Sequence, residues 1–345
     1  MTTAHIAVAG AGLIGKRHVQ AMAQAAGAQL AAIVDPMPAT ADYAARLGVP
    51  HFSTLGAMIS AGVAGGVILA TPNQLHVEGA LACVRAGLPV LVEKPLATDV
   101  GEAQALVEAA EAAGVPLATG HHRRHNPLIA AAKAMIVAGE IGTPVSVHSM
   151  FWLMKPDEYF DISWRREPGA GPVFVNLIHD IDLLRHLVGE VAAVQAAQSN
   201  AVRGNAVEET AVITLEFANG ALGTANVSDT IPAPWSWELT TGENPAYPKT
   251  SEACYLIGGT HGALELPSGK LWHYTGKRSW WEPLSTRIAS HASGDPLVLQ
   301  IEQFARVIGT GEAPLVSGRE GLRTLAVIEA IKTAARLGRR VTLQE

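Results

Sequence analysis

The chain has 345 residues, 48% of them hydrophobic and 16% charged, a composition typical of a globular protein of about two domains. Its formal net charge is −6 and it has no basic block, which argues against nucleic acid or a membrane surface as a partner. The two cysteines, Cys83 and Cys254, lack CxxC spacing and predict neither a disulfide framework nor a zinc site. No apolar run is long enough to span a bilayer, and a strand expected at residues 5–9 leaves no room for a signal peptide, so we expect a cytoplasmic protein.

The first expected elements enclose a glycine-rich turn. A short apolar strand at residues 5–9 is followed by GAGLIG and then by helical spacing to residue 22. In GxGxxG the first glycine makes the tight turn, the second admits a pyrophosphate to the backbone, and the third lets helix and strand pack closely. The helix N-terminus adds N–H groups that bind phosphate. The turn therefore predicts a dinucleotide site that includes Gly10, Gly12, Leu13, Ile14 and Gly15.

The second expected strand, residues 29–34, ends in Asp35. A carboxylate at this position accepts hydrogen bonds from the adenine ribose hydroxyls and repels a 2′-phosphate. Pro36 and Met37 follow, so no Arg or Lys stands there to neutralise such a phosphate. We therefore expect NAD rather than NADP as cofactor, and a turn before Pro36 is the alternative role of Asp35.

Strands and helices then alternate with a period of about thirty residues, which is typical of a doubly wound parallel sheet. This pattern predicts a Rossmann domain over residues 1–121 in an α/β protein. The last long helix of the domain is expected to be capped by Thr98. We expect strands at 5–9, 29–34, 51–52, 67–70, 90–92 and 115–119, and helices at 16–22, 39–47, 75–85 and 98–113.

Two of these strands end in polar residues. Thr71, Pro72 and Asn73 follow the strand at 67–70, and His76 comes three residues later. Because ligands bind outside the carboxyl ends of strands in open α/β sheets, these residues are expected to line a cofactor's path from ribose to nicotinamide. The alternative for Asn73 is an N-cap of the following helix.

The strand at 90–92 runs into Glu93, Lys94 and Pro95. Proline ends the strand because it has no N–H to donate. Lys94 is thereby delivered to the edge of the sheet where a bound cofactor would present its reactive face. Taken alone, the two charged residues would fit a solvated strand end, and only the preceding motifs favour a functional role.

Together these motifs resemble the Gfo/Idh/MocA oxidoreductases. The resemblance rests on the glycine turn with His18, on ATPN followed by His76, and on the Glu-Lys-Pro motif, and it covers the whole chain in order. It implies that Lys94 lies beside the nicotinamide and binds the substrate oxygen. It also implies an α+β second domain, residues 122–345, built on a large, mostly antiparallel open sheet that completes the site.

The second domain begins near three histidines and two arginines, in GHHRRHNP. We discount a metal site there because strand-to-loop spacing scatters the imidazoles and no carboxylate or thiol is near. The resemblance implies that the arginines line the cleft, so Arg123 or Arg124 is a candidate anchor for substrate hydroxyls or a carboxylate. An ion pair with an acid between the domains is an equally good interpretation for either one.

The segment from residue 171 to 188 has apolar residues at helical spacing and carries His179. The resemblance makes His179 the second catalytic group. Many relatives have an Asp four residues before this His, but here that position is Val175, followed by Asn176. Asn can hold a hydroxyl but takes no proton at pH 7. We therefore expect Lys94 and His179 to share the acid–base work.

Beyond residue 190 strands dominate, with a strong hairpin signal at Asn219-Gly220. Residues 231–253 are expected to form a long irregular loop, in which Trp235 or Trp237 stacks on a sugar ring or else packs in the core or at a subunit contact. Trp164, in a loop at 157–168, is a further candidate for substrate binding. Helices are expected at 127–138, 296–308 and 318–337, the last returning towards the first domain.

The sequence thus predicts an NAD-dependent dehydrogenase that acts on a secondary alcohol of a sugar, polyol or sugar acid. A free sheet face predicts a homodimer or homotetramer. Two alternatives stay open: an NAD-binding sensor without catalysis, against which both Lys94 and His179 argue, and a reductase of another carbonyl or imine.

Overall fold

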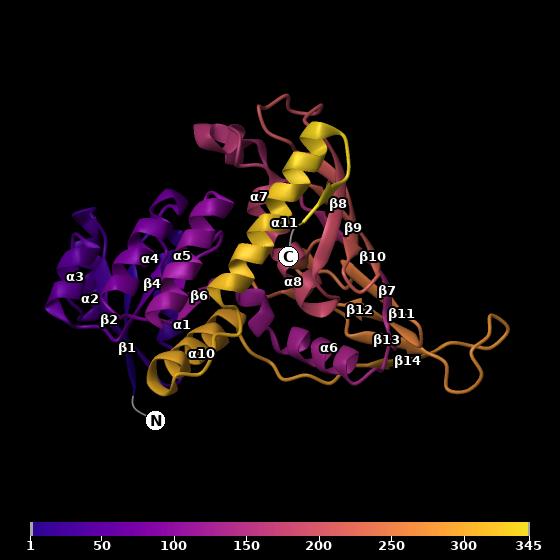
Figure 1. Cartoon of the computed structure of the whole chain (residues 1–345), viewed down its shortest axis with the longest axis horizontal. Helices are drawn as coiled ribbons and strands as arrows, with labels where there is room; N and C mark the ends of the chain where they lie inside the picture. The colour runs from indigo at the N-terminus through magenta and orange to yellow at the C-terminus, as the bar shows by residue number, and fades with distance from the viewer. Residues whose placement is uncertain (1–2, 344–345) are drawn as a thin grey trace. The chain divides into compact units, whose positions relative to one another are not determined.

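The computed structural model describes residues 3–343, and the chain forms two compact units. The first unit comprises Met1–Asn126 and Gly294–Leu325, and the second comprises Pro127–Ser293 and Ala326–Glu345. The chain therefore passes from one unit to the other three times. Figure 1 labels the helices and strands of both units.

The first unit is built on six parallel strands in the order β3-β2-β1-β4-β5-β6. This order confirms the predicted doubly wound parallel sheet. It reverses between β1 and β4, and such a reversal is where open α/β sheets bind their ligands. The strands are β1 Ala4–Ala9, β2 Ala28–Val34, β3 His51–Phe52, β4 Gly66–Leu69, β5 Val90–Val92 and β6 Leu117–Thr119.

The helices of this unit follow the predicted alternation with three differences. A short helix that was not predicted, α3, starts after Thr54, whose hydroxyl accepts a hydrogen bond from the Ala57 N–H. Asp99, and not Thr98, caps α5, and Asn73 opens a single 3₁₀ turn instead of capping α4. The helices are α1 Leu13–Met22, α2 Ala39–Leu47, α3 Leu55–Ala61, η1 Asn73–Leu75, α4 His76–Arg85, α5 Val100–Ala113 and η2 His122–His125.

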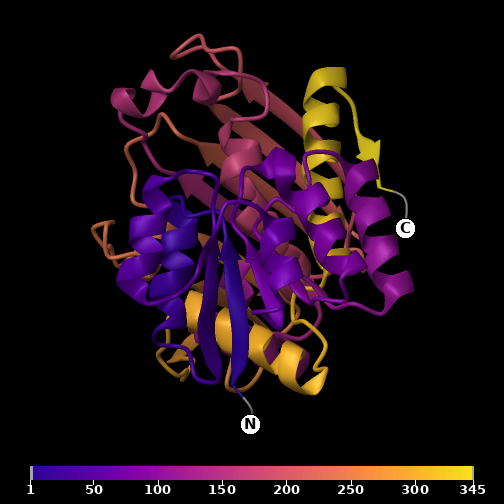
Figure 2. The ribbon, with the colours of Figure 1, turned by 90° about the vertical axis from the view of Figure 1, so that its left-hand side faces the viewer.

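Two C-terminal helices complete the first unit, namely α10 (Pro296–Thr310) and the first part of α11 (Gly318–Leu337). Leu297, Ile301 and Phe304 of α10 join the core that contains residues of β1 and β2. Figure 2 shows α10 crossing this sheet. The chain between the two helices then covers the β6 edge, where Thr119 N–H bonds to the Val316 carbonyl.

The second unit is built on nine strands in the order β14-β13-β12-β11-β7-β10-β9-β8-β15. The β7–β10 pair is parallel and the other pairs are antiparallel, which confirms the predicted mostly antiparallel sheet. The β9–β10 hairpin turns at Gly220, whose φ is +86°, as the Asn-Gly signal predicted. The strands are β7 Pro144–Trp152, β8 Val191–Ser199, β9 Thr210–Phe217, β10 Leu222–Ser228, β11 Tyr255–Gly259, β12 Gly262–Leu266, β13 Lys270–His273, β14 Ser285–Ile288 and β15 Val341–Thr342.

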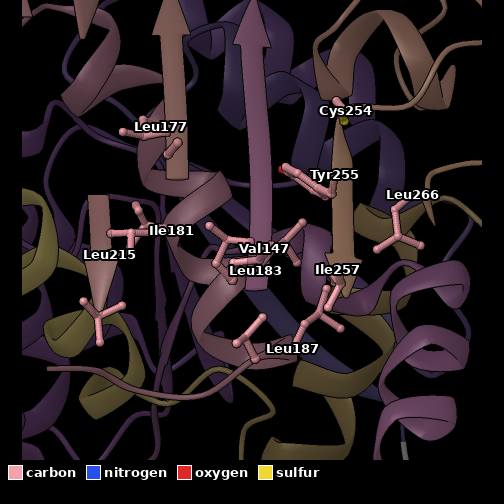
Figure 3. Packing of buried hydrophobic residues seen from close by; sticks show 14 of the residues in the cluster. Val147, Leu177, Ile181, Leu183, Leu187, Leu215, Cys254, Tyr255, Ile257 and Leu266 are labelled. Atoms are coloured by element: carbon pink, nitrogen blue, oxygen red, sulfur yellow. The ribbon is translucent and has the colours of Figure 1, made fainter. Parts of the chain in front are cut away.

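The core of the second unit lies between this sheet and α8 (Leu177–Leu187). Leu183 and Leu187 of α8 point towards Val147 of β7 and Ile257 of β11 in Figure 3. The other helices of the unit are α6 Pro127–Val137, α7 Pro172–Val175, α9 Trp237–Thr241, and the 3₁₀ turns η3 Asp157–Asp161 and η4 Ser163–Arg166.

Two expectations for the second unit were wrong. The segment from residue 171 is not one helix, because it breaks at Asn176 (φ −109°, ψ −55°) between α7 and α8. The segment 231–253 is not wholly irregular, because Ser236 caps the short helix α9 by accepting a hydrogen bond from the Leu239 N–H. Among residues 3–343, no helix combines the length and the apolar run that crossing a membrane requires.

Candidate functional site

The glycine turn of the first unit has the geometry of a phosphate cradle. A Cβ on Gly10 (φ +92°) would lie 2.4 Å from the Ala70 carbonyl oxygen, and a Cβ on Gly15 would meet the Gly10 carbonyl oxygen. A Cβ on Gly12, in contrast, would meet nothing within 4 Å. Gly12 is the N-cap of α1 and has no side chain that could occupy the helix N-terminus. The first and third glycines are thus required by packing, whereas the second keeps space for a ligand's phosphates.

The side chains after Gly12 border the same space. Leu13 is 93% exposed and Ile14 is 39% exposed, although both are apolar and begin an otherwise half-buried helix. Exposed apolar residues at a helix N-terminus that offers N–H groups fit a surface that a bound dinucleotide covers. The residues present therefore fit the cofactor that the sequence predicted.

Asp35 stands at the carboxyl end of β2, beside the glycine turn. One carboxylate oxygen accepts a hydrogen bond from the Ala11 N–H at 2.7 Å, and the other accepts one from the Met37 N–H at 2.9 Å. These two bonds fix the carboxylate next to the turn. Because a carboxylate offers about four acceptor positions, it keeps capacity for ribose hydroxyls.

The two polar strand ends of the first unit are tied together by His76. The buried imidazole places Nδ1 2.8 Å from the Pro95 carbonyl oxygen and Nε2 3.0 Å from the Thr71 carbonyl oxygen. His76 therefore links the loop after β4 to the loop after β5. The Thr71 hydroxyl itself is buried and has no hydrogen-bond partner among the described residues, which leaves it for a ligand.

Glu93 forms a buried pair with His18 that the sequence did not reveal. His18 Nε2 lies 2.6 Å from Glu93 Oε1, and the other Glu93 oxygen accepts the Lys94 backbone N–H at 3.2 Å. Burial would raise the pKa of Glu93, but the hydrogen bond from His18 and the nearby positive charges outweigh it and lower the pKa to about 2. The ionised carboxylate thus joins α1, the helix that follows the glycine turn, to the strand end that carries Lys94.

Lys94 lies partly buried at the carboxyl end of β5, next to β4 in the sheet, and the Lys94–Pro95 peptide is cis. His122, in the neighbouring η2 turn, has its pKa lowered to about 3 by burial and by the charge of Arg123. Its imidazole is therefore neutral at neutral pH. Lys94 stands in a set of buried polar groups at the sheet edge where doubly wound folds bind ligands.

Arg123 and Arg124 are both buried in η2. Arg124 donates to Glu320 of α11 at 2.9 Å, within the first unit. This ion pair corresponds to the alternative interpretation of the arginines, although its acid belongs to the same unit. Substrate binding by either arginine stays a prediction.

In the second unit, Asn176 and His179 occupy the start of α8. The Asn176 carbonyl accepts the His179 N–H at 3.1 Å, which closes the first helical turn. The Asn176 side-chain oxygen is buried without a partner among the described residues, while the residue as a whole is partly exposed. An acceptor in this state fits a ligand hydroxyl. His179 is buried, with 8% of its surface exposed.

The two candidate tryptophans differ in their surroundings. Trp164 of η4 is 54% exposed, with the Arg165 guanidinium 5.6 Å from its ring centre. Trp235 is partly exposed, and its ring meets Trp152 edge-on at 5.6 Å. Trp237 is buried in the core, so of the two tryptophans considered in this segment only Trp235 keeps a free surface. Between residues 3 and 343, no cluster of His, Cys, Asp or Glu is arranged to hold a metal ion.

Comparison with known families gives two matches that together span most of the chain. Residues 4–121 match the Gfo/Idh/MocA model described as an oxidoreductase family with an NAD-binding Rossmann fold. Residues 133–343 match the corresponding C-terminal alpha/beta domain.

Curated relatives and solved structures agree with these matches. The rhizopine catabolism protein MocA of Rhizobium meliloti is 26% identical over 96% of this chain and 94% of its own length. Inositol 2-dehydrogenase 2 of Saccharopolyspora erythraea is 32% identical over 64% of this chain and 65% of its own length. The WlbA dehydrogenase of Bordetella pertussis, solved with NADH and UDP-GlcNAcA, is 29% identical with a TM-score of 0.79 over 99% of both chains. A levoglucosan dehydrogenase, 23% identical with a TM-score of 0.84 over the full length of both chains, shares the fold.

Proposed function

The chain belongs to the Gfo/Idh/MocA oxidoreductases, an NAD-binding family, and on that premise we propose that it transfers a hydride between NAD and a secondary alcohol or ketone of a sugar, polyol or sugar acid. The observation that carries the proposal is the position of Lys94. It stands at the end of β5 in a Rossmann sheet, next to β4, and the strand order reverses between β4 and β1, where Gly12 leaves room for phosphates.

The residues of the first unit divide the work of cofactor binding. Gly12 and the α1 N-terminus would receive the pyrophosphate, and Asp35 would accept hydrogen bonds from the ribose hydroxyls. The Thr71 hydroxyl would face the bound cofactor, and His76 would contribute indirectly, because its two ring nitrogens lie 2.8 and 3.0 Å from the backbone carbonyl oxygens of Pro95 and Thr71. Pro72, Asn73 and the backbone of Glu93, at the ends of the neighbouring strands β4 and β5, would border the same path. When bound, the nicotinamide accepts or donates the hydride.

Lys94 and His179 are assigned the substrate's reacting oxygen. The Lys94 ammonium bonds to this oxygen and stabilises the negative charge that develops on it during oxidation. His179 takes the hydroxyl proton, because imidazole changes its charge near neutral pH. Val175, where many relatives have Asp, supplies no proton acceptor, so the proton passes to His179 while Lys94 stays an ammonium.

Substrate hydroxyls away from the reacting carbon are assigned to the second unit. The unpartnered side-chain oxygen of Asn176 supports a bond to one such hydroxyl. The partly exposed rings of Trp164 and Trp235 offer apolar faces on which a sugar ring stacks. The names of the relatives support the same substrate class, since they include inositol and apiose dehydrogenases.

A panel of sugars, inositols and sugar acids, each incubated with NAD and with NADP, tests this proposal through the absorbance of the reduced nicotinamide. We expect turnover of at least one carbohydrate with NAD in preference to NADP. Binding of NAD without turnover of any carbohydrate would contradict the proposal. It would favour a sensor, or a reductase of another carbonyl or imine.

We further propose that the outward face of the nine-stranded sheet forms a homodimer or homotetramer contact. Side chains that alternate with the buried core residues leave apolar groups exposed on five strands. These are Val212, Leu222, Leu256, Trp272 and Ile288. Exposed apolar groups spread over one sheet face mark an association surface. Light scattering on the purified protein measures the assembly, and a monomer at micromolar concentration would contradict it. We also propose that the protein is located in the cytoplasm.

A further inference from the structure

We propose that Tyr255 and Asp180 form a positioning pair that holds the first turn of α8, and with it His179, against the sheet of the second unit. This inference rests on the proposed function for its kinetic meaning. The contacts that carry it lie wholly within one unit.

The pair joins two elements far apart in the sequence. The Tyr255 hydroxyl donates a hydrogen bond to Asp180 Oδ1. Tyr255 begins β11, and Asp180 directly follows His179 in the first turn of α8. Figure 3 shows the Tyr255 side chain on β11 pointing towards the helix that carries Leu177 and Ile181. The bond therefore fixes the end of α8 at which His179 is placed.

Burying the Tyr255 hydroxyl and the Asp180 carboxylate costs free energy, because both groups lose their contacts with water. Tyr255 is 0% exposed and Asp180 is 1% exposed, and both lie among the apolar residues of the core. A buried carboxylate loses its hydration, whereas an apolar side chain of similar volume would pack there without that cost. A hydrogen bond between a strand and a helix instead favours one relative position of the two elements. Fixing such a register is the best-attested use of buried polar groups.

The pair also connects to the segment that contains Trp235. The Trp237 ring stacks on Tyr255 at 5.6 Å with an angle of 25° between the rings, and Trp237 Nε1 donates to Glu243 at 2.8 Å. Ser236 caps the same short helix, α9. Trp235, the candidate sugar platform, directly precedes this anchored turn. A continuous buried connection thus leads from the segment that contains Trp235, through Trp237, Tyr255 and Asp180, to the helical turn that carries His179.

Three variants separate positioning from simple stabilisation. Tyr255→Phe removes only the hydroxyl and leaves the ring stacked on Trp237. The double variant Tyr255→Phe/Asp180→Leu removes both partners of this hydrogen bond, so that neither of the two is left buried without the other. Tyr274→Phe, beyond the end of β13, removes a tyrosine hydroxyl elsewhere in the same unit and serves as the matched control.

Two measurements are made on each full-length variant. The first is the ¹⁵N spectrum of the histidine side chains, with the His179 signal identified by its loss in His179→Gln. The second is kcat and KM on the best carbohydrate substrate, together with thermal stability. The spectrum needs no substrate, so it decides on the positioning pair even if the wild type oxidises no carbohydrate and the proposed function fails.

For Tyr255→Phe we expect a displaced or broadened His179 signal and a kcat lowered tenfold or more at unchanged KM for NAD, because a small misplacement of a reacting group is costly. We expect the double variant to be more thermally stable than Tyr255→Phe, with a His179 signal and a kcat that still differ from those of the wild type. Tyr274→Phe matches the wild type in both measurements. An unchanged His179 signal in Tyr255→Phe would overturn the inference, and so would recovery of kcat along with stability in the double variant.

Discussion

The buried His18–Glu93 pair makes a quantitative prediction about acid stability. The pKa of Glu93 is lowered to about 2 in the folded protein, against 4.5 for the ordinary side chain. Each pKa unit of difference between the folded and unfolded states corresponds to about 1.4 kcal/mol, so the ionised carboxylate contributes about 3 kcal/mol to the free energy of unfolding. Because the folded pKa is the lower one, this contribution is complete above pH 4.5 and is lost as the pH falls towards 2.

Glu93→Gln removes the charge while keeping the shape of the side chain. We expect it to lower the free energy of unfolding by about 3 kcal/mol at pH 7, and we expect the gap from the wild type to narrow below pH 4.5. Urea denaturation at a series of pH values, followed by circular dichroism, measures both curves. Glu252→Gln, which changes an exposed glutamate, is the matched control and should follow the wild type throughout. A gap that stays constant across the acid range would refute the reasoning, because Glu93 would then carry no charge-dependent stability.

The other predictions concern single residues of the two units. Gly12→Ala should change the free energy of unfolding by less than about 1 kcal/mol, because its Cβ would meet no protein atom. It should weaken NAD binding at least tenfold in a fluorescence titration, because the Cβ would occupy the space assigned to the phosphates. Gly10→Ala should instead lower the free energy of unfolding by more than about 2 kcal/mol in urea denaturation, because its Cβ would meet backbone atoms and φ is +92°. Equal effects of the two variants on stability and on NAD binding would contradict the different roles assigned to the two glycines. Asp35→Asn should lower the preference for NAD over NADP at least tenfold in kcat/KM, and an unchanged ratio would remove Asp35 from cofactor selection. Val175→Asp should move the acid limb of the kcat/KM profile to higher pH, because a carboxylate stabilises a nearby imidazolium, and an unmoved limb would mean that the new carboxylate does not reach His179.

The Rossmann half of the fold was predictable because its signals are local. Short strands of two to seven residues alternate with amphipathic helices, several of which end at a glycine, in the order that the sheet requires. The prediction of single residues was wrong where two neighbouring residues are equally suited to the same role. Thr98 and Asp99 are both favourable N-caps, and only the structure shows that Asp99 accepts the N–H bonds of Gly101 and Glu102.

The less predictable features depend on contacts between distant residues. His18 and Glu93 are 75 positions apart, and a histidine on a helix face gives no sign of its partner. Tyr255 and Asp180 are likewise 75 positions apart. The break at Asn176 was hidden because the apolar spacing continues across it. The contribution of α10 to the first unit was also hidden, since the apolar face of α10 would suit either core.

Lys94 is proposed to act on the substrate oxygen beside the bound cofactor. The most direct measurement compares wild type and Lys94→Met for NAD affinity, by fluorescence titration, and for turnover of the best carbohydrate substrate. We predict an NAD affinity within a factor of about three and a turnover at least a hundredfold lower, because the positive charge at the developing oxyanion is lost. Wild-type turnover by Lys94→Met would contradict the claim.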